Sequence, residues 1–285
     1  VLRSSPTLPA NLLPIRVVCL SDTHCQIPEI VPDGDLLIHA GDLTQAGTPT
    51  ELQAQIDWLN SLPHAHKVVI AGNHDTYLDP RSRTTLPPTD VEGASLDWGN
   101  IHYLQHSGTT LTFPSHRNRK LRIHGAPQIP ACGGPEFAFQ YPRGQDAWRD
   151  TIPSGVDILV THTPPKHHMD LYGLGCEHLL SELWRVKPRL HIFGHVHAGR
   201  GKETMYYDDA QKAFEDGCGR KDGFIRGFFD LWLWVDLVKV VWHGVGSVVW
   251  DRVWGGEGRA SRLVNASVMY INTGQLRNMP QVVEI

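Results

Sequence analysis

The stretch R-V-V-C-L-S-D-T-H (residues 16–24) joins an apolar run directly to two side chains that commonly bind metals. The apolar run predicts a buried β-strand, because it is short and bounded by turn-forming residues. Asp22 and His24 follow at the end of this strand. They are two residues apart in a loop that leaves a strand, so both can face one ion.

The same arrangement, an apolar run followed by metal-binding side chains, returns four times along the chain. The further candidates are Asp42 in A-G-D, Asn73 in A-G-N-H-D, His162 in V-T-H-T, and His195 and His197 in G-H-V-H. In open α/β sheets, ligand sites collect outside the carboxyl ends of the strands. These segments therefore predict one shared metal centre.

The ligand types indicate which ions this centre binds. Imidazole suits Zn, Fe, Ni or Mn, and carboxylate and amide oxygens suit harder ions. Asp42 can bridge two ions about 3.5–4 Å apart, which then hold a hydroxide and stabilise an in-line displacement. His74, beside Asn73, is the predicted catalytic residue, as a proton donor to the leaving group or a contact to phosphate. Asp75 is expected to orient His74.

Further apolar runs predict a layered α/β protein, because near-continuous apolar strands are covered on both faces. We expect strands at 16–21, 35–40, 67–71, 120–125, 156–161 and 189–194, helices at 50–62 and 177–186, and a hairpin at 101–113. His64, His66, His167 and His168 are expected on the surface, and Cys25 is expected to pack rather than react. His124 and Arg143 are candidates for substrate contacts.

Composition excludes several classes of protein. The chain has 285 residues, 41% apolar and 20% charged, and a net charge of -4. The sequence contains no basic patch of the kind that binds nucleic acids, so we expect no nucleic-acid partner. The five cysteines are widely spaced without C-x-x-C, which favours a reducing compartment and a cytoplasmic location. Prolines interrupt the N-terminal segment, so we expect no signal peptide, and the uncharged apolar runs are too short for a transmembrane segment.

Residues 201–261 form a Trp-rich segment that we expect to be an insertion within a single domain spanning 1–285. Five of the nine tryptophans lie there. Asp236, Lys239 and His243 are three and four residues apart, which predicts the water-exposed stripe of an amphipathic helix. Gly244 and Gly246 argue against one long helix. The alternatives are packing on the domain, a homodimer, or surface association through 225–256, including binding to a membrane surface.

The motifs S-D-T-H, G-D, G-N-H-D, T-H and G-H-V-H, in this order, resemble the calcineurin-like metallophosphoesterase superfamily. The resemblance covers residues 16–197, with a further match at 263–285. It implies a four-layer α-β-β-α sandwich of two mixed sheets with a dinuclear metal site at the strand carboxyl ends. It assigns one ion to Asp22, His24, Asp42 and His197, and the other to Asp42, Asn73, His162 and His195. His74 matches the catalytic histidine.

Further segments, among them H-A-G-D-L-T-Q-A-G and V-D-I-L-V-T-H-T-P-P, resemble the metallophosphoesterase-domain-containing (MPPED-like) subgroup. This resemblance implies hydrolysis of a small phosphomonoester or phosphodiester, with nucleotides among the candidate substrates and manganese among the candidate metals. Gln128 departs from the subgroup, which tends to carry an aromatic there, and the Trp-rich segment is longer than expected. Two alternatives stay open: a Lewis-acid site for a non-phosphate substrate, and a non-enzymatic protein that binds nucleotides or partners.

Overall fold

The computed structural model describes residues 12–171, 173–219, 231–254, 260–271 and 273–285. One sheet contains β1 (Arg16–Leu20), β2 (Leu36–Ala40), β3 (His66–Ile70), β4 (Ile101–Tyr103) and β13 (Gln281–Glu284). A second contains β5 (Ser107–Phe113), β6 (Arg119–Ala126), β9 (Ile158–Thr161), β10 (Leu190–Phe193), β11 (Gly201–Tyr206) and β12 (Ala260–Asn265), and a separate pair is β7 (Ile129–Pro130) with β8 (Gln140–Tyr141). The α-helices are α1 (Pro49–Ser61), α2 (Pro88–Val91), α3 (Glu177–Val186), α4 (Asp209–Gly219) and α6 (Leu231–Trp254). Short 3-10 turns are η1 (Thr76–Leu78), η2 (Ser82–Thr85), η3 (Pro114–His116) and η4 (His197–Gly199).

Both large sheets are mixed, as the resemblance implied. The first has the order β13-β1-β2-β3-β4, and only the β13–β1 pair is antiparallel. The second has the order β11-β12-β10-β9-β6-β5, parallel in the middle and antiparallel at both edges. Each predicted strand and both predicted helices are present, with ends within two residues of those expected.

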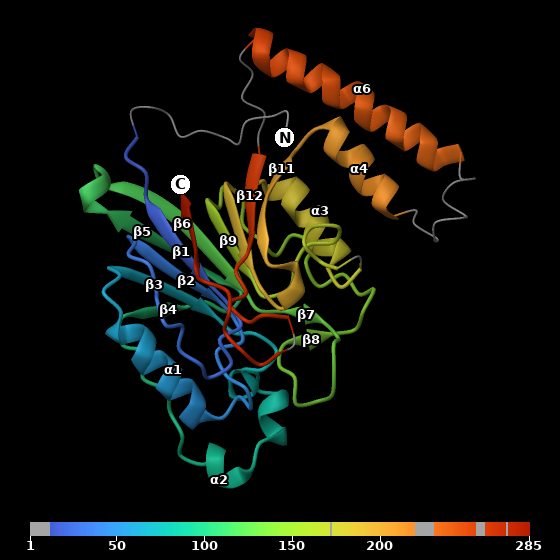
Figure 1. Cartoon of the computed structure of the whole chain (residues 1–285). Helices are drawn as coiled ribbons and strands as arrows, with labels where there is room; N and C mark the ends of the chain where they lie inside the picture. The colour runs from blue at the N-terminus through green and yellow to red at the C-terminus, as the bar shows by residue number, and fades with distance from the viewer. Residues whose placement is uncertain (1–11, 172, 220–230, 255–259, 272) are drawn as a thin grey trace.

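Alternating side chains build the layers. In β1, Val17 and Cys19 enter the core between the two sheets, whereas Val18 and Leu20 face α1. On the second sheet, Phe193 and its neighbours pack against α3 in the same way. The strands are therefore buried on both faces, which explains their continuous apolar runs. Figure 1 shows α1 and α3 on opposite sides of the two sheets.

The predicted hairpin at 101–113 is wrong. β4 pairs in parallel with β3 of the first sheet, and β5 pairs with β6 of the second. The chain crosses between sheets at a tight turn in which His106 has a φ of 48°. The local sequence contains two short strands and a turn in either case, and only the tertiary pairing distinguishes a hairpin from a crossover.

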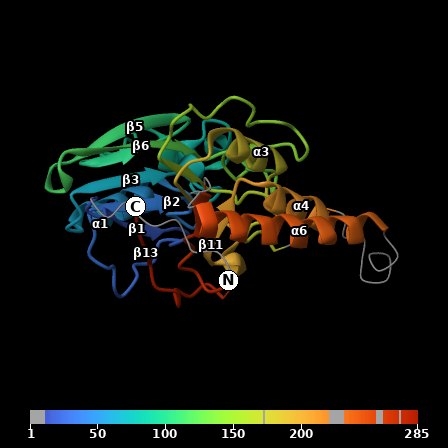
Figure 2. The same cartoon turned by 90° about the horizontal axis from the view of Figure 1, so that it is seen from above.

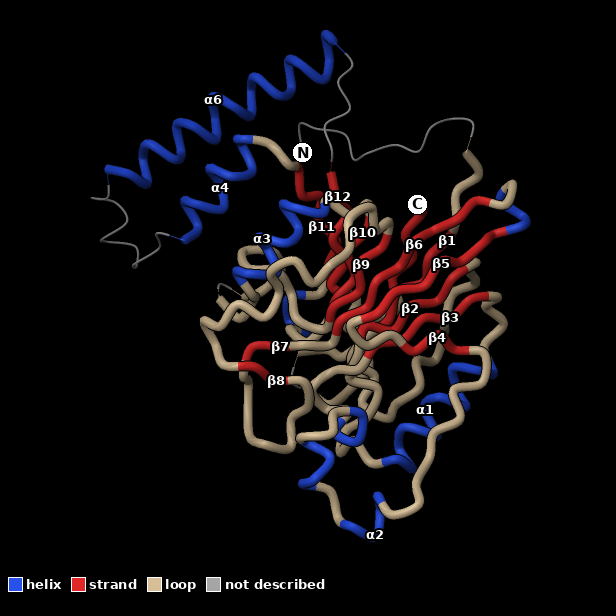
Figure 3. Tube along the Cα trace, turned by 180° about the vertical axis from the view of Figure 1, so that it is seen from behind, coloured by secondary structure: helices blue, strands red, loops and turns tan. Residues whose placement is uncertain are grey.

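The chain leaves the second sheet after β11 and returns at β12, which pair antiparallel. Between them lie α4 and α6, side by side at the edge of the molecule (Figures 1 and 3). α6 continues through Gly244 and Gly246, contrary to the expectation of a break. By length and composition, the segment Leu231–Val249 could cross a membrane, and 6% of it is buried inside the protein. This finding qualifies the expectation that the chain has no transmembrane segment. Residues 225–230 and 255–256 of the expected association segment lie outside the described residues.

Candidate metal centre

All seven predicted ligands lie in loops just beyond strand ends, and both sheets contribute. Four come from the first sheet: Asp22 and His24 follow β1, Asp42 follows β2 and Asn73 follows β3. Three come from the second sheet: His162 follows β9, and His195 and His197 follow β10. Two groups of donor atoms form here, each with all its members within 4.8 Å of one another: Asp22, His24, Asp42 and His197, and Asp42, His162 and His195. Asp42 belongs to both groups, so its carboxylate can bridge two ions.

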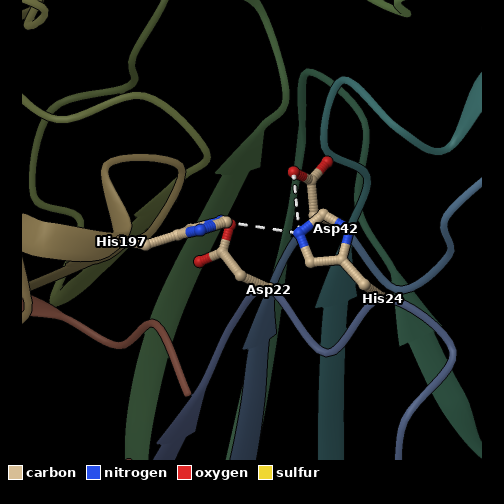
Figure 4. Close-up of side chains that lie close together, drawn as sticks. All are labelled: Asp22, His24, Asp42 and His197. Carbon is tan, nitrogen blue, oxygen red and sulfur yellow. Dashed lines mark hydrogen bonds and ion pairs between the residues drawn. The ribbon is translucent and has the colours of Figure 1, made fainter. Parts of the chain in front are cut away.

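The first group encloses a small space between imidazole and carboxylate atoms (Figure 4). The Nε2 atoms of His24 and His197 are 3.4 Å apart. His197 Nε2 lies 3.3 Å from an oxygen of Asp22, and His24 Nε2 lies 3.8 Å from Asp42 Oδ2. Two imidazole nitrogens facing each other beside two carboxylates suit a divalent cation between them.

The second group approaches the same Asp42 oxygen through His162. His162 Nε2 lies 3.3 Å from Asp42 Oδ2 and 3.0 Å from Asn73 Oδ1. The ring of His195 stands edge-on to that of His162, with 5.2 Å between centroids. Asn73 therefore joins this group and supplies a neutral oxygen.

Backbone carbonyls orient three of the histidines. The Nδ1 atoms of His24, His162 and His197 lie 3.2, 2.8 and 2.8 Å from the carbonyl oxygens of Thr44, Ala40 and Ile271. A carbonyl only accepts hydrogen bonds, so each Nδ1 carries the proton and donates it. The Nε2 lone pairs are then left for a metal, which is the usual arrangement around metal-binding histidines. The donor set thus fits borderline divalent cations.

The electrostatics of the centre favour ionised carboxylates and divide the histidines into two that favour the protonated form, His162 and His197, and two that favour the neutral form, His24 and His195. Burial opposes ionisation of Asp22, but hydrogen bonding and charge from His197 outweigh it and lower its pKa to about 2. Burial likewise opposes ionisation of Asp42, yet His162 holds its pKa well below the usual value. Burial lowers the pKa of His195 to about 4 and also lowers that of His24. Burial also opposes protonation of His162 and His197, but Asp42 and Asp22 outweigh it, raising the pKa of His162 to about 9 and that of His197 above its usual value. A histidine binds a cation through its neutral form, so metal binding would release protons from these two residues.

The backbone is unusual where it carries the ligands. Asp22, His24, Asp42 and His195 have φ values of 59°, 46°, 55° and 64°, in the left-handed region that residues other than glycine rarely adopt. Such conformations cost about 1–3 kcal/mol each and cluster at functional sites. Glycine is required beside them: a Cβ on Gly41 would lie 2.6 Å from His162 Nδ1, and one on Gly194 would overlap the Asp22 carboxylate.

His74 lies beside the first group without joining it. Its backbone N–H donates to Asp42 Oδ1 at 2.8 Å, and its ring lies edge-on to His24 with 4.8 Å between centroids. Its Nδ1 lies 2.9 Å from the carbonyl oxygen of Gln45, so Nδ1 donates and Nε2 is left for another partner. The carbonyl of Gln45, and not Asp75, therefore orients this ring.

Asp75 connects two ligand loops instead. Its buried carboxylate accepts from the backbone N–H groups of Gly72, Leu43 and Thr44 and from the Thr44 hydroxyl, at 2.7 to 3.3 Å. Sequence reasoning also missed Ser21, whose hydroxyl donates to the Ala40 carbonyl at 3.1 Å and joins the first two loops. The small hydroxyl residues inside S-D-T-H and G-D-L-T were the signal for both connections.

Several histidines expected on the surface are buried. His64 is 3% exposed and lies 2.9 Å from the Pro32 carbonyl, and His168 is fully buried between two glutamates. His66 is half-buried and lies 3.1 Å from the Thr112 carbonyl, while His167 is half-buried on the loop after β9. The hydrophobic periodicity of the sequence does not predict that these histidines are buried, because the burial of each depends on a partner from another element.

Two other candidates outside the centre, Arg143 and Gln128, bond to backbone carbonyls. Arg143 donates through Nε to the Ala131 carbonyl at 2.8 Å, and Gln128 is buried and donates to the Ala147 carbonyl at 3.4 Å. His124 is 5% exposed. Cys25 is exposed, so the expectation that it packs is wrong, and its thiol sulfur accepts from the Gln45 backbone N–H at 3.3 Å. Partial burial raises the pKa of this thiol to about 11, which opposes a role as nucleophile.

A cavity of about 700 Å³ lies between the loop that follows His162 and helix α4. Gly199, at the end of the turn that starts with His197, also forms part of its wall. Lys166, His167 and Asp170 supply polar groups, and Met169, Leu171 and Phe214 supply an apolar surface. Such a mixture is typical of small-molecule sites.

Comparisons with known proteins agree with this geometry. Residues 15–199 match the family described as calcineurin-like phosphoesterase. The chain is 42% identical over 257 residues to "Probable rhamnogalacturonate lyase C" of Emericella nidulans, covering 90% of this chain and 23% of that protein. It is 40% identical over 210 residues to the human "Metallophosphoesterase domain-containing protein 1", covering 65% of this chain and 61% of that protein. A UPF0046 protein of Caenorhabditis elegans is 38% identical over 206 residues, 67% of this chain and 71% of that protein.

Proposed function

The chain belongs to the calcineurin-like phosphoesterase family, and from this premise we propose that it is a metal-dependent hydrolase of a small phosphate monoester or diester. The observation that carries the proposal is the pair of donor groups that share Asp42. One group would hold an ion through Asp22, His24, Asp42 and His197, and the other through Asp42, Asn73, His162 and His195. Divalent ions bound there would polarise phosphoryl oxygens and lower the pKa of bound water.

The protein's own residues supply the remaining requirements. Two carboxylates are the only acidic ligands of the proposed set, so two divalent ions would leave a surplus of positive charge that attracts a phosphate ester. His74 would act through Nε2, because its Nδ1 is engaged with Gln45. When protonated, Nε2 can donate to the leaving oxygen or bind a phosphoryl oxygen.

We place the organic part of the substrate in the cavity between the loop after His162 and α4. Phe214 and Leu171 would pack against it, and His167 would contact a polar group. Lys166 already pairs with Glu177 at 2.9 Å, so it contributes less charge than an unpaired lysine. Nucleotides, including cyclic nucleotides, are the substrate class to examine first because they combine a phosphate ester with a flat apolar base. No disulfide joins the described cysteines, which supports a reducing compartment such as the cytoplasm.

The test combines metal analysis with a panel of substrates. Protein loaded with Mn, Fe, Zn or Ni is assayed on p-nitrophenyl phosphate, bis-p-nitrophenyl phosphate, and cyclic and linear nucleotides. His74→Ala should keep its metals while kcat falls about 10²- to 10⁴-fold. His102→Ala, at an exposed position on β4, is the matched control and should leave kcat unchanged. Bound metal with no hydrolysis of any phosphate ester would refute the proposal.

The Lewis-acid alternative for a non-phosphate substrate has less support. It predicted a pocket lined by tryptophans of the 228–254 segment without cationic groups. The cavity instead has Lys166 and His167 in its wall, and no described tryptophan of α6 is part of it.

A further inference from the structure

Helix α6 is oriented with its polar side inward and its apolar side outward. Asp236 is 3% exposed and faces α4 near Gly217, and the Ser247 hydroxyl lies 3.5 Å from a carboxylate oxygen of Asp208. On the opposite side Trp242 is 76% exposed and Val238 is 65% exposed. Of the stripe expected to face water, Asp236 therefore faces the protein, His243 is half-buried and Lys239 is exposed, while the apolar side faces away from the protein.

The outer face of α6 has almost no charge. Between residues 231 and 249, Lys239 is the only charged side chain that the structure shows exposed, and its Nζ lies 3.5 Å from Asp236 Oδ1. Its aliphatic stem can lie along the helix while the ammonium group stays in water. The rest of the face consists of Leu231, Trp232, Trp234, Leu237, Val238, Val241, Trp242, Val245 and Val249, each at least 47% exposed. This surface matches a hydrocarbon phase and offers no groups for a charged ligand.

The shape of the helix favours a lipid surface over a second copy of the chain. In Figures 1 and 2, α6 stands at the edge of the molecule with α4 between it and the sheets. A helix of 24 residues is a strip about 36 Å long and about 10 Å wide. Stable protein interfaces surround an apolar centre with a polar rim and carry about ten hydrogen bonds, which a strip with one exposed charged side chain does not offer. A membrane requires no such matching surface, since binding increases with the apolar area inserted.

We propose that α6 docks this protein on a lipid bilayer, lying in the plane of the interface with its outer face among the acyl chains. The contacts with α4 favour this orientation over a membrane-crossing one. α4 exposes Asp209, Lys212 and Asp216, which must stay in water. An in-plane helix leaves α4 on the aqueous side, and Trp242 suits the boundary between headgroups and acyl chains. The proposal holds whether or not the chain hydrolyses phosphate esters.

The test is flotation of the full chain with large unilamellar vesicles of phosphatidylcholine, alone or with phosphatidylserine. The wild type should float with both, because its outer face is apolar. Val238→Glu/Val245→Glu places two charges on that face, seven residues apart at positions 65% and 60% exposed, and should weaken binding at least about tenfold. Ile30→Glu/Met279→Glu, at positions 58% and 55% exposed elsewhere, is the matched control and should bind like the wild type.

A second measurement locates the helix directly. Vesicles with brominated acyl chains should quench tryptophan fluorescence, and Trp242→Phe should reduce that quenching even if the charged variant misfolds. Wild type that does not float with either vesicle overturns the proposal, as does binding only to phosphatidylserine, or equal loss in the control variant. If light scattering shows a dimer that Val238→Glu/Val245→Glu dissociates while neither protein floats, a second copy covers the helix. Binding should persist after metal removal, which separates this result from any failure of the hydrolase proposal.

Discussion

Replacement of His168 by glutamine should destabilise the protein in a pH-dependent way. His168 is fully buried, with Nδ1 2.9 Å from Glu203 Oε1 and Nε2 3.2 Å from Glu215 Oε1. Burial lowers the pKa of His168, but hydrogen bonds and charge from Glu203 and Glu215 outweigh it and raise the pKa from 6.5 to about 9. The charged imidazole therefore joins the loop after His162 to β11 and α4.

The size and sign of the effect follow from this shift. A shift of about 2.5 pKa units corresponds to about 3 kcal/mol at 1.36 kcal/mol per unit. The Glu203 side chain is 34% exposed, and solvent screening reduces the expected loss to about 2 kcal/mol. Because the folded-state pKa is raised above the unfolded value, the stabilisation is complete below pH 6.5 and is lost as pH rises through about 9.

Urea unfolding followed by tryptophan fluorescence, at pH 6 and at pH 9.5, measures this difference. His168→Gln should lose about 2 kcal/mol of unfolding free energy at pH 6 and clearly less at pH 9.5. The exposed His102 provides the control, and His102→Gln should change stability by less than about 0.5 kcal/mol at either pH. An equal loss for His168→Gln at both pH values would show that packing, and not charge, explains the effect.

Three further predictions test the centre and the cavity. Asp42→Asn should lower the metal content, measured by mass spectrometry, to well below one ion per chain, whereas His24→Ala should keep about one ion, because only Asp42 belongs to both groups. Equal losses of metal in the two variants would contradict a bridging role for Asp42. Gly194→Ala should reduce metal content and lower the unfolding free energy in urea by about 1–3 kcal/mol, since its methyl group would overlap the Ser21 hydroxyl and the Asp22 carboxylate. An unchanged protein would refute the close packing. Phe214→Ala should raise KM about three- to tenfold with kcat unchanged in steady-state assays on the best substrate, because it removes binding common to ground and transition states; an unchanged KM would remove the cavity from the proposed substrate site.

Prediction from the sequence succeeded where the chemistry is local. The strands before Asp22, Asp42 and His162 were predicted from uninterrupted apolar runs, which reflect burial on both faces. Ligand types and their position after strand ends were sufficient to predict that these residues meet. The links made by Asp75 and Ser21 were missed, because side-chain hydrogen bonds between loops have no periodic pattern.

Long-range packing decided the remainder. The 101–113 segment contains the strands of a hairpin, but its two strands pair with different sheets. The apolar and polar sides of α6 are evident in the sequence, but periodicity does not state which side meets the protein. The sequence by itself determined the set of donor atoms and the order of the strands that carry them, because both depend on residue type and neighbouring residues. Only the tertiary structure decided that Asp42 lies between two groups, that His168 is enclosed by two glutamates, and that the apolar side of α6 faces outward, because each depends on partners brought from distant parts of the chain.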